Sequence, residues 1–263
     1  MESPDMSDPL IIRADASHQM GVGHLMRCIA LAEACQARGG QVIFLSHCKQ
    51  DGLRRRIEAT GIPFVPLNAS HPHPLDLRTT LSLAQTCAQK SASPWIVLDG
   101  YHLDPAYQQS IQLAGYRLLV IDDMAHQPQY FTDILLNQNL GAEQLTYPCS
   151  PDTQKLLGAQ YILLRSEFLS QTPRQRSFPN TASKVLVTLG GGDPDHVTRK
   201  VIRGLKHLGR PDLEVRAIVG PTNPNMAQIR QAAKRLPCPV EPLQSAPDMS
   251  KHMAWADVAI SAS

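Results

Sequence analysis

The sequence lacks a cysteine framework. Its six cysteines lie far apart, without a Cys-x-x-Cys pair or a cluster of histidine partners. Neither a set of disulfides nor a structural zinc site is therefore expected, and reduced thiols in the cytosol fit this pattern best.

Long apolar runs and targeting segments are missing too. No stretch approaches the roughly 18 apolar residues that are needed to span a bilayer. The polar, acidic N-terminus does not resemble a signal peptide. We expect a soluble, cytoplasmic protein.

The chain also has no excess of charge of either sign. The 25 Lys and Arg are nearly balanced by 23 Asp and Glu, the net charge is +2, and both signs are mixed along the sequence. This balance gives no electrostatic footprint for nucleic acid or membranes. One dense basic cluster, Arg54–Arg56, is interpreted as a solvated helix face. We expect a small-molecule ligand, with no nucleic-acid or membrane partner; no oligomeric state is predicted.

Short apolar runs alternate with longer helical patterns, and the 263 residues, 43% of them hydrophobic, suit two domains. Continuous apolar strands separated by helices indicate a parallel sheet that is covered on both faces. Residues 9–165 are therefore predicted to form a doubly wound α/β domain. The expected strands are Leu10–Arg13, Val42–Ser46, Phe64–Leu67, Trp95–Leu98, Leu118–Ile121 and Ile134–Leu136.

Residues 166–183 are polar and contain proline, which predicts a linker. The alternation restarts over residues 184–263, which are predicted to form a second doubly wound, nucleotide-binding domain. Two such domains place a ligand cleft between them, at the carboxyl ends of both sheets. The sequence stops at a strand without a following helix, so we expect a C-terminally truncated chain whose second domain is incomplete by on the order of 70–100 residues.

A glycine turn after the first predicted strand is the leading candidate site. In Gly21-x-Gly23-His24, the glycines allow a tight turn or the close approach of a ligand, and helix-start amides favour anionic or polar groups. The helix dipole disfavours protonation of His24, so a neutral imidazole is available as a general base. Arg27, one turn later, is a candidate for binding phosphate or a carboxylate. An ordinary polar histidine in a tight turn is the alternative.

Polar residues follow later strands of the first domain, at the same edge of the predicted sheet. Tyr101 either orients a sugar hydroxyl or covers the sheet edge. Asn137 either hydrogen-bonds a ligand through its amide or stabilises a turn. Asp122 and Asp123 suggest paired carboxylates or a metal site, but without a third oxygen ligand a cap for the next segment is favoured.

The second domain has a glycine-rich loop of its own. Gly190, Gly191 and Gly192 end a strand and precede a helix, so their amides and the positive end of that helix suit a diphosphate. The loop lacks the lysine of a Walker P-loop, which argues against a P-loop ATPase. Gly220 and Ser261 follow later strands at the equivalent edge, and together these loops predict a nucleotide pocket.

Short motifs occur in a fixed order along the chain. They are Arg13-x-Asp15, Gly21-x-Gly23-His24-x-x-Arg27, Asp99-x-Tyr101, Asp122-Asp123, Asn137-x-Asn139, Arg165-x-Glu167-Phe168, Gly190-Gly191-x-Asp193 and Ile260-Ser261-Ala262. This ordered set resembles the UDP-sugar hydrolases of pseudaminic acid biosynthesis, which release UDP from UDP-2,4-diacetamido-2,4,6-trideoxy-β-L-altropyranose. The chain is similar, more distantly, to GT-B glycosyltransferases.

The resemblance implies a GT-B-like fold and a UDP-sugar substrate, with UDP on the C-terminal domain. It implies that His24 activates water for inverting attack at the anomeric carbon, with no metal or other cofactor, and that Tyr101 lies near the sugar. The family continues after Ser261 with a helix that holds the nucleotide, so part of the UDP site is expected to be missing. Substrate contacts are assigned to Asp15, Gly21, Gly23, Arg27, Tyr101, Asn137 and Arg165, and UDP contacts to Gly190, Gly191, Gly192, Gly220 and Ser261.

Two other functions fit the same patterns. A GT-B glycosyltransferase presents an acceptor hydroxyl in place of water, and Arg54–Arg56 keeps open a membrane-docking patch for a lipid acceptor. A non-catalytic module that binds sugar nucleotides is the second alternative, although the intact glycine–histidine turn argues against it.

Overall fold

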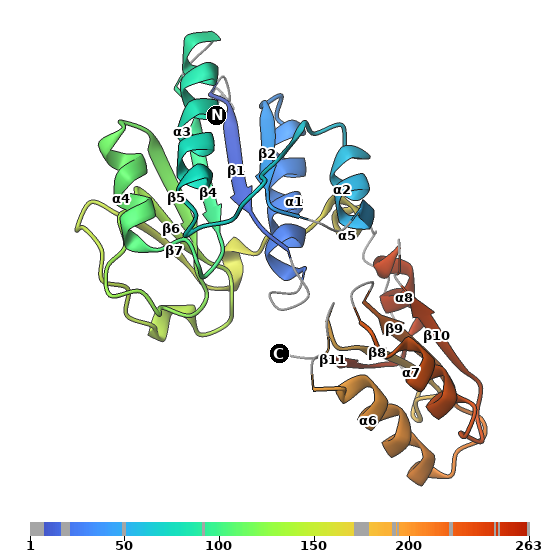
Figure 1. The fold of residues 1–263 in the computed structure, drawn as a ribbon. Helices are drawn as coiled ribbons and strands as arrows, with labels where there is room; N and C mark the ends of the chain where they lie inside the picture. Colours follow the sequence, from blue (N-terminus) through green and yellow to red (C-terminus); the bar gives the residue numbers. More distant parts are fainter. Residues whose placement is uncertain are drawn as a thin grey trace. The chain divides into compact units, whose positions relative to one another are not determined.

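The computed structural model describes residues 8–16, 22–48, 51–90, 93–170, 179–190, 193, 195–220, 223–244, 246 and 248–261. These residues divide into two compact units (Figure 1): the first holds residues 8–16 and 24–166, and the second is formed mainly by residues 167–261. Within the described residues, no helix combines the length and the apolar character that crossing a bilayer requires.

The first unit is built on a parallel sheet of seven described strands in the order β3-β2-β1-β4-β5-β6-β7. β1 and β4 are neighbours at its centre, and their register pairs Ala14 with Asp99. The strand order changes direction at β1, which creates the kind of switch point where open α/β sheets bind ligands. The strands are β1 (Leu10–Ala14), β2 (Val42–Ser46), β3 (Phe64–Pro66), β4 (Trp95–Asp99), β5 (Arg117–Ile121), β6 (Ile134–Asn137) and β7 (Gln154–Leu157).

Helices cover both faces of this sheet. The apolar residues of α3 and α4 pack with alternate strand residues, among them Ile11, Ile96 and Leu118, in one core. Right-handed crossovers put α1 and α2 on the opposite face. The helices are α1 (Gly23–Gln36), α2 (Asp51–Glu58), α3 (Pro74–Lys90), α4 (Pro105–Leu113) and α5 (Ser166–Leu169), with 3-10 turns η1 (Ala142–Gln144) and η2 (Ala159–Tyr161).

Two elements do not follow from the apolar pattern. β7 has the sequence Gln-Lys-Leu-Leu and is half exposed, because it lies at the edge of the sheet and pairs only with β6 among the described strands. α5 lies inside the stretch that its composition marks as a linker, of which residues 171–178 are outside the described residues.

The second unit repeats the same winding on a smaller scale, with four described parallel strands in the order β10-β9-β8-β11. Val185 and Val187 of β8 face α6 and α7, whereas Leu186 faces the side of α8. This alternation is the period of two that a sheet buried on both faces requires. The elements are β8 (Lys184–Thr188), α6 (Val197–Leu205), η3 (Lys206–Leu208), β9 (Glu214–Val219), α7 (Met226–Ala233), β10 (Val240–Gln244), α8 (Met249–Trp255) and β11 (Val258–Ser261).

Candidate functional site

His24 lies in the first turn of α1, directly after the carboxyl end of β1, and its side chain is buried. Its Nδ1 is 2.6 Å from Oδ1 of Asp99, the fully buried last residue of β4. Because a carboxylate only accepts hydrogen bonds, the shorter contact with Asp99 places the proton on Nδ1 and the lone pair of the neutral ring on Nε2, although Arg27 Nη2 also lies 3.2 Å from Nδ1. The structure thus adds an acidic partner that fixes the ring of His24 and its tautomer.

Arg27, one turn along α1, joins this pair to a second carboxylate. Its Nε and Nη2 each donate to Asp99 over 2.6 Å, and its Nη1 donates to Asp123 over 2.8 Å. Burial disfavours the charged guanidinium, but the contacts with Asp99 and Asp123 raise the pKa of Arg27 above its ordinary value. Burial likewise opposes ionisation of Asp123, yet Tyr101 and Arg27 hold the pKa of its carboxyl below its ordinary value. The guanidinium that the sequence suggested for phosphate is therefore engaged with carboxylates.

Tyr101 closes the cluster from the loop after β4. Its hydroxyl donates to Asp123 over 2.6 Å, and its ring meets that of His24 edge-on, with centroids 4.8 Å apart. Burial and the neighbouring Asp123 raise the pKa of Tyr101 above its ordinary value, so the hydroxyl stays a donor. The residue is nevertheless 42% exposed, so part of it remains accessible to solvent beside His24. We call His24, Arg27, Asp99, Tyr101 and Asp123 the His24 cluster.

A second polar cluster lies on the α3 side of the same sheet edge. Arg13 of β1 is fully buried and donates to Asp15 over 2.7 Å and to Asp76 of α3 over 2.9 Å. Asp15 also accepts from Ser70 Oγ over 2.6 Å and lies 3.1 Å from His102 Nε2. Although burial opposes its charge, hydrogen bonds from His102 and Arg13 hold the pKa of Asp15 well below its ordinary value. We call these five residues the Arg13 cluster.

His102 is a polar residue of this edge to which the sequence analysis gave no role. Its Nε2 is 3.1 Å from both Ser70 Oγ and Asp15, and its Nδ1 is buried with no hydrogen-bond partner among the described residues. The signal was present in the sequence, because His102 follows Tyr101 in the loop after a buried strand. Its partner Ser70 lies 32 residues away in sequence, so only the fold joins them.

The other residues predicted for the first unit have separate environments. Gly23 is exposed at the start of α1, and a Cβ placed there would meet nothing within 4 Å. Asn137 is buried, with its amide donating to Tyr147 and accepting from the backbone of Asn139. Arg165 is partly buried just before α5. Gly21 lies outside the described residues.

Asp122 and Asp123, although adjacent, have different roles. Asp122 accepts from the backbone N–H groups of Met124 and Ala125 over 2.8 Å each, as expected of a cap. Asp123 instead bonds Arg27 and Tyr101 of the His24 cluster. Only one carboxylate of this pair therefore reaches the candidate site.

In the second unit, the parallel strands bring the predicted loops to one edge. β8, β9 and β11 are neighbours, and Gly190, Gly220 and Ser261 lie at or just after their carboxyl ends. Gly190 has φ +84°, a conformation that favours glycine. Gly191 and Gly192 lie outside the described residues.

Asp193 is the residue of this edge that the sequence analysis left without a role. It is buried, and its carboxylate accepts from the backbone N–H groups of Val197 over 2.7 Å and Thr198 over 3.1 Å, at the start of α6. A phosphate at this helix start would compete with Asp193 for the same donors. The spacing of an aspartate four residues before a helical valine was the available signal.

No family model matches the chain. It is 24% identical over 219 residues to the uncharacterized protein MJ1062 of Methanocaldococcus jannaschii, an alignment that covers 81% of this chain and 42% of that protein. The chain thus spans less than half the length of this curated relative.

Solved structures match over almost the whole chain. MurG of Acinetobacter baumannii has a TM-score of 0.60 and 16% identity, covering 97% of this chain and 72% of MurG. HepE of Anabaena in complex with UDP-glucose has a TM-score of 0.62 and 12% identity, covering 95% and 72%. A putative UDP-N-acetylglucosamine 2-epimerase from Listeria monocytogenes has a TM-score of 0.54 and 10% identity, covering 98% and 74%.

The fold is GT-B-like. Its first unit carries both polar clusters at the carboxyl edge of one sheet, where the elements of an α/β fold leave room for ligands. The His24 cluster holds an imidazole that is oriented by Asp99, and an arginine that is shared between Asp99 and Asp123. The Arg13 cluster fixes the end of β1. Such an arrangement supports proton transfer next to a polar ligand.

Proposed function

We propose that the protein is a UDP-sugar hydrolase, with a UDP-linked deoxy diacetamido sugar as its substrate in nonulosonate biosynthesis. The observation that carries the proposal is the 2.6 Å contact between His24 Nδ1 and the buried Asp99. A histidine oriented by a carboxylate is the usual form of a general base in proteins. The order of motifs along the chain supports the choice of substrate.

In the proposed reaction, His24 Nε2 takes a proton from water as the water oxygen attacks the anomeric carbon. The bond between that carbon and the UDP oxygen breaks, and UDP leaves with the electron pair. The configuration inverts because attack and departure are on opposite faces of the sugar. Asp99 stabilises the imidazolium that forms, and the protonated hydroxyl of Tyr101 lies beside the ring to orient a sugar group.

The second unit supplies the nucleotide contacts in this proposal. Gly190, Gly220 and Ser261 are at one sheet edge, where their loops suit a diphosphate. The complexes of HepE with UDP and UDP-glucose support UDP as the nucleotide.

Glycosyl transfer is the competing function, because one solved neighbour, from Rickettsia africae, is described as a glycosyltransferase. Turnover in ¹⁸O-water separates the two. Hydrolysis at the anomeric carbon puts the label in the free sugar. Label in UDP would refute attack at carbon, and a new glycoside formed faster than free sugar would establish transfer.

His24→Asn tests the base directly. We expect UDP release to fall by at least about a hundredfold, while the affinity for UDP measured by calorimetry stays nearly unchanged. His73→Asn, an exposed histidine of the same unit, is the matched control and should keep full activity. Retained activity of His24→Asn would refute the assignment.

A further inference from the structure

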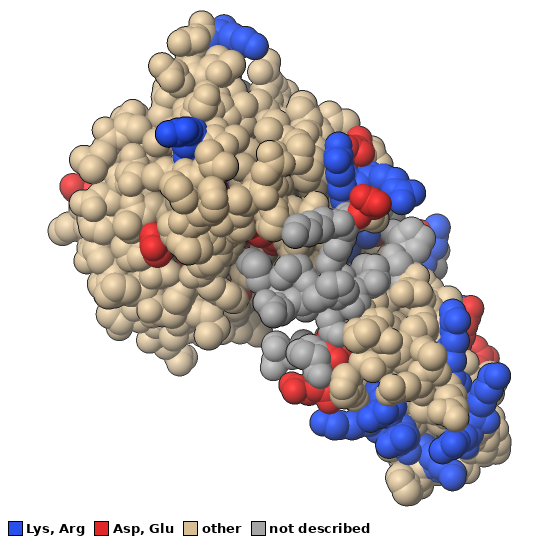
Figure 2. Space-filling model, viewed as in Figure 1, with Lys and Arg blue, Asp and Glu red and all other residues tan. Residues whose placement is uncertain are grey.

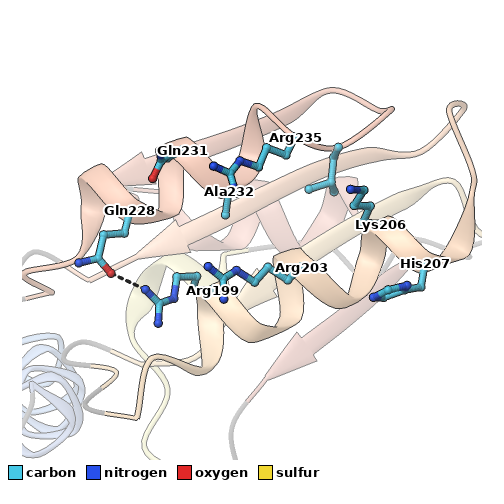
Figure 3. A pocket seen from close by; sticks show the side chains of 9 residues that line it. Arg199, Arg203, Lys206, His207, Gln228, Gln231, Ala232 and Arg235 are labelled. Atoms are coloured by element: carbon cyan, nitrogen blue, oxygen red, sulfur yellow. Dashed lines mark hydrogen bonds between the residues drawn. The ribbon is translucent and has the colours of Figure 1, made fainter.

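A basic groove lies between α6 and α7 of the second unit (Figure 3). It has a volume of about 530 Å³. Arg199 and Arg203 extend into it from α6, and Arg235 reaches it from the residues after α7. Its lining also includes Lys206, Gln228 and Gln231. We call Arg199, Arg203, Lys206 and Arg235 the groove cations.

The segment of the chain that forms this groove is rich in cations. Residues 197–235 hold nine Lys and Arg against two acids, although the whole chain has a net charge of only +2. Figure 2 shows several blue side chains close together on the second unit, whereas those on the first unit are scattered. This local excess is already present in the sequence, although the chain as a whole is nearly neutral. The packing of α6 beside α7 then brings the four groove cations together.

The groove cations have no carboxylate partners among the described residues. The ion pairs of this unit instead use Arg210, Arg216 and Lys251. On α6, Arg199 and Arg203 are four residues apart and face each other without an intervening acid, an arrangement that destabilises a helix by a few tenths of a kcal/mol. This repulsion would be relieved by a bound anion.

Arg199 is held in place at the edge of the groove. Its Nη1 donates to Gln228 Oε1 over 2.6 Å, which fixes the guanidinium at the edge of the groove. Its Nε is buried and has no hydrogen-bond partner within the described part of the chain. Buried donors of this kind are nearly always satisfied by protein, water or ligand.

We propose that the groove binds a compact anion with two or more phosphate groups, of the size of pyrophosphate or a nucleoside polyphosphate. Its volume lies in the range of small-ligand pockets, about 300–1,000 Å³. Three guanidinium groups suit phosphate because each offers a planar fork of donors. A concave site whose cations converge from two helices favours a compact ligand over a flat membrane surface. The site shares no residue with the proposed hydrolase machinery.

Calorimetric titration of the intact chain with inorganic pyrophosphate at low ionic strength tests the site. We expect saturable binding that weakens about tenfold in Arg203→Gln and again in Arg235→Gln. Arg230→Gln on α7 removes the same charge outside the groove, and its affinity should stay within about twofold of the wild type. Urea unfolding of each variant in a Trp95→Phe background, followed by Trp255 fluorescence, checks that the second unit remains folded.

Three results would overturn the proposal. If Arg230→Gln weakened pyrophosphate binding equally, the anion would be attracted by the overall positive charge of the second unit and not bound in the groove. Undiminished binding in the Arg203→Gln/Arg235→Gln double variant would place the anion elsewhere, for example at the Gly190 loop. Binding to phosphatidylglycerol vesicles that depends on the groove cations, without saturable pyrophosphate binding, would identify the groove as a membrane contact.

Discussion

Arg13→Met would leave two buried carboxylates, those of Asp15 and Asp76, without the cation that they share. Removing one partner of a buried ion pair typically costs 3–5 kcal/mol. In this protein both carboxylates keep other donors: His47 N at 2.7 Å and Ser70 Oγ at 2.6 Å for Asp15. The His71 amide at 2.6 Å and the Tyr107 hydroxyl at 2.8 Å remain for Asp76. We therefore expect a loss near the lower end of the range, about 3 kcal/mol in the free energy of unfolding.

The tryptophans allow this loss to be measured in the correct unit. The chain has two, Trp95 in β4 of the first unit and Trp255 in α8 of the second. In a Trp255→Phe background, fluorescence during urea unfolding therefore follows the first unit alone. Arg54→Met is the matched control, because its pair with Glu58 is exposed and worth at most about 1 kcal/mol.

The pH dependence gives a second, independent test of Arg13→Met. In the wild type, burial opposes ionisation, but contacts that include Arg13 hold the pKa values of Asp15 and Asp76 below the ordinary value. The resulting stability is present above the unfolded pKa of about 3.9 and is lost as the pH falls below it. In Arg13→Met the buried carboxylates protonate more readily, so the deficit should shrink from pH 7 toward pH 4. A deficit below about 1 kcal/mol, or one independent of pH, would refute this account.

Two further predictions concern the helix starts. Asp193→Ala should destabilise the second unit by about 1–2 kcal/mol, because two amides at the start of α6 lose their acceptor. The change should appear in Trp255 fluorescence during urea unfolding in a Trp95→Phe background but not in Trp95 fluorescence in the Trp255→Phe background, and an unchanged midpoint would contradict the capping role. Gly23→Ala should leave stability unchanged or raise it by up to about 1 kcal/mol, since the added methyl meets nothing within 4 Å. Its KM for the UDP-sugar should nevertheless rise if the substrate approaches this turn, and an unaltered KM would exclude that approach.

Local patterns in the sequence predicted most of the fold. The apolar run Val42–Ser46 is a strand with the bounds that its composition indicated, and the runs Trp95–Leu98 and Ile134–Leu136 are strands that extend one residue further. The pattern succeeds because strands buried on both faces need continuous apolar residues, and the helices between them need an apolar stripe. It failed for β7, whose half-polar sequence is stabilised by pairing with β6 rather than by its own composition.

The partners of the polar residues were decided by the tertiary structure. The sequence identified His24 and Tyr101 from their positions after strands, but the Asp99 contact of His24 spans 75 residues. Arg13 and Asp76 are 63 residues apart and meet only because α3 packs beside β1.

The charge of the second unit likewise depends partly on the sequence and partly on the tertiary structure. Composition determined a near-neutral chain, but the expectation that both signs are mixed along it fails for residues 197–235, which hold nine Lys and Arg against two acids. Parallel winding then placed α6 and α7 side by side and brought Arg199, Arg203 and Arg235 to one groove. A sequence specifies which residues share the face of one helix through its 3.6-residue period. Which faces of different helices meet depends on the packing of the whole sheet, and that packing creates the candidate sites of this protein.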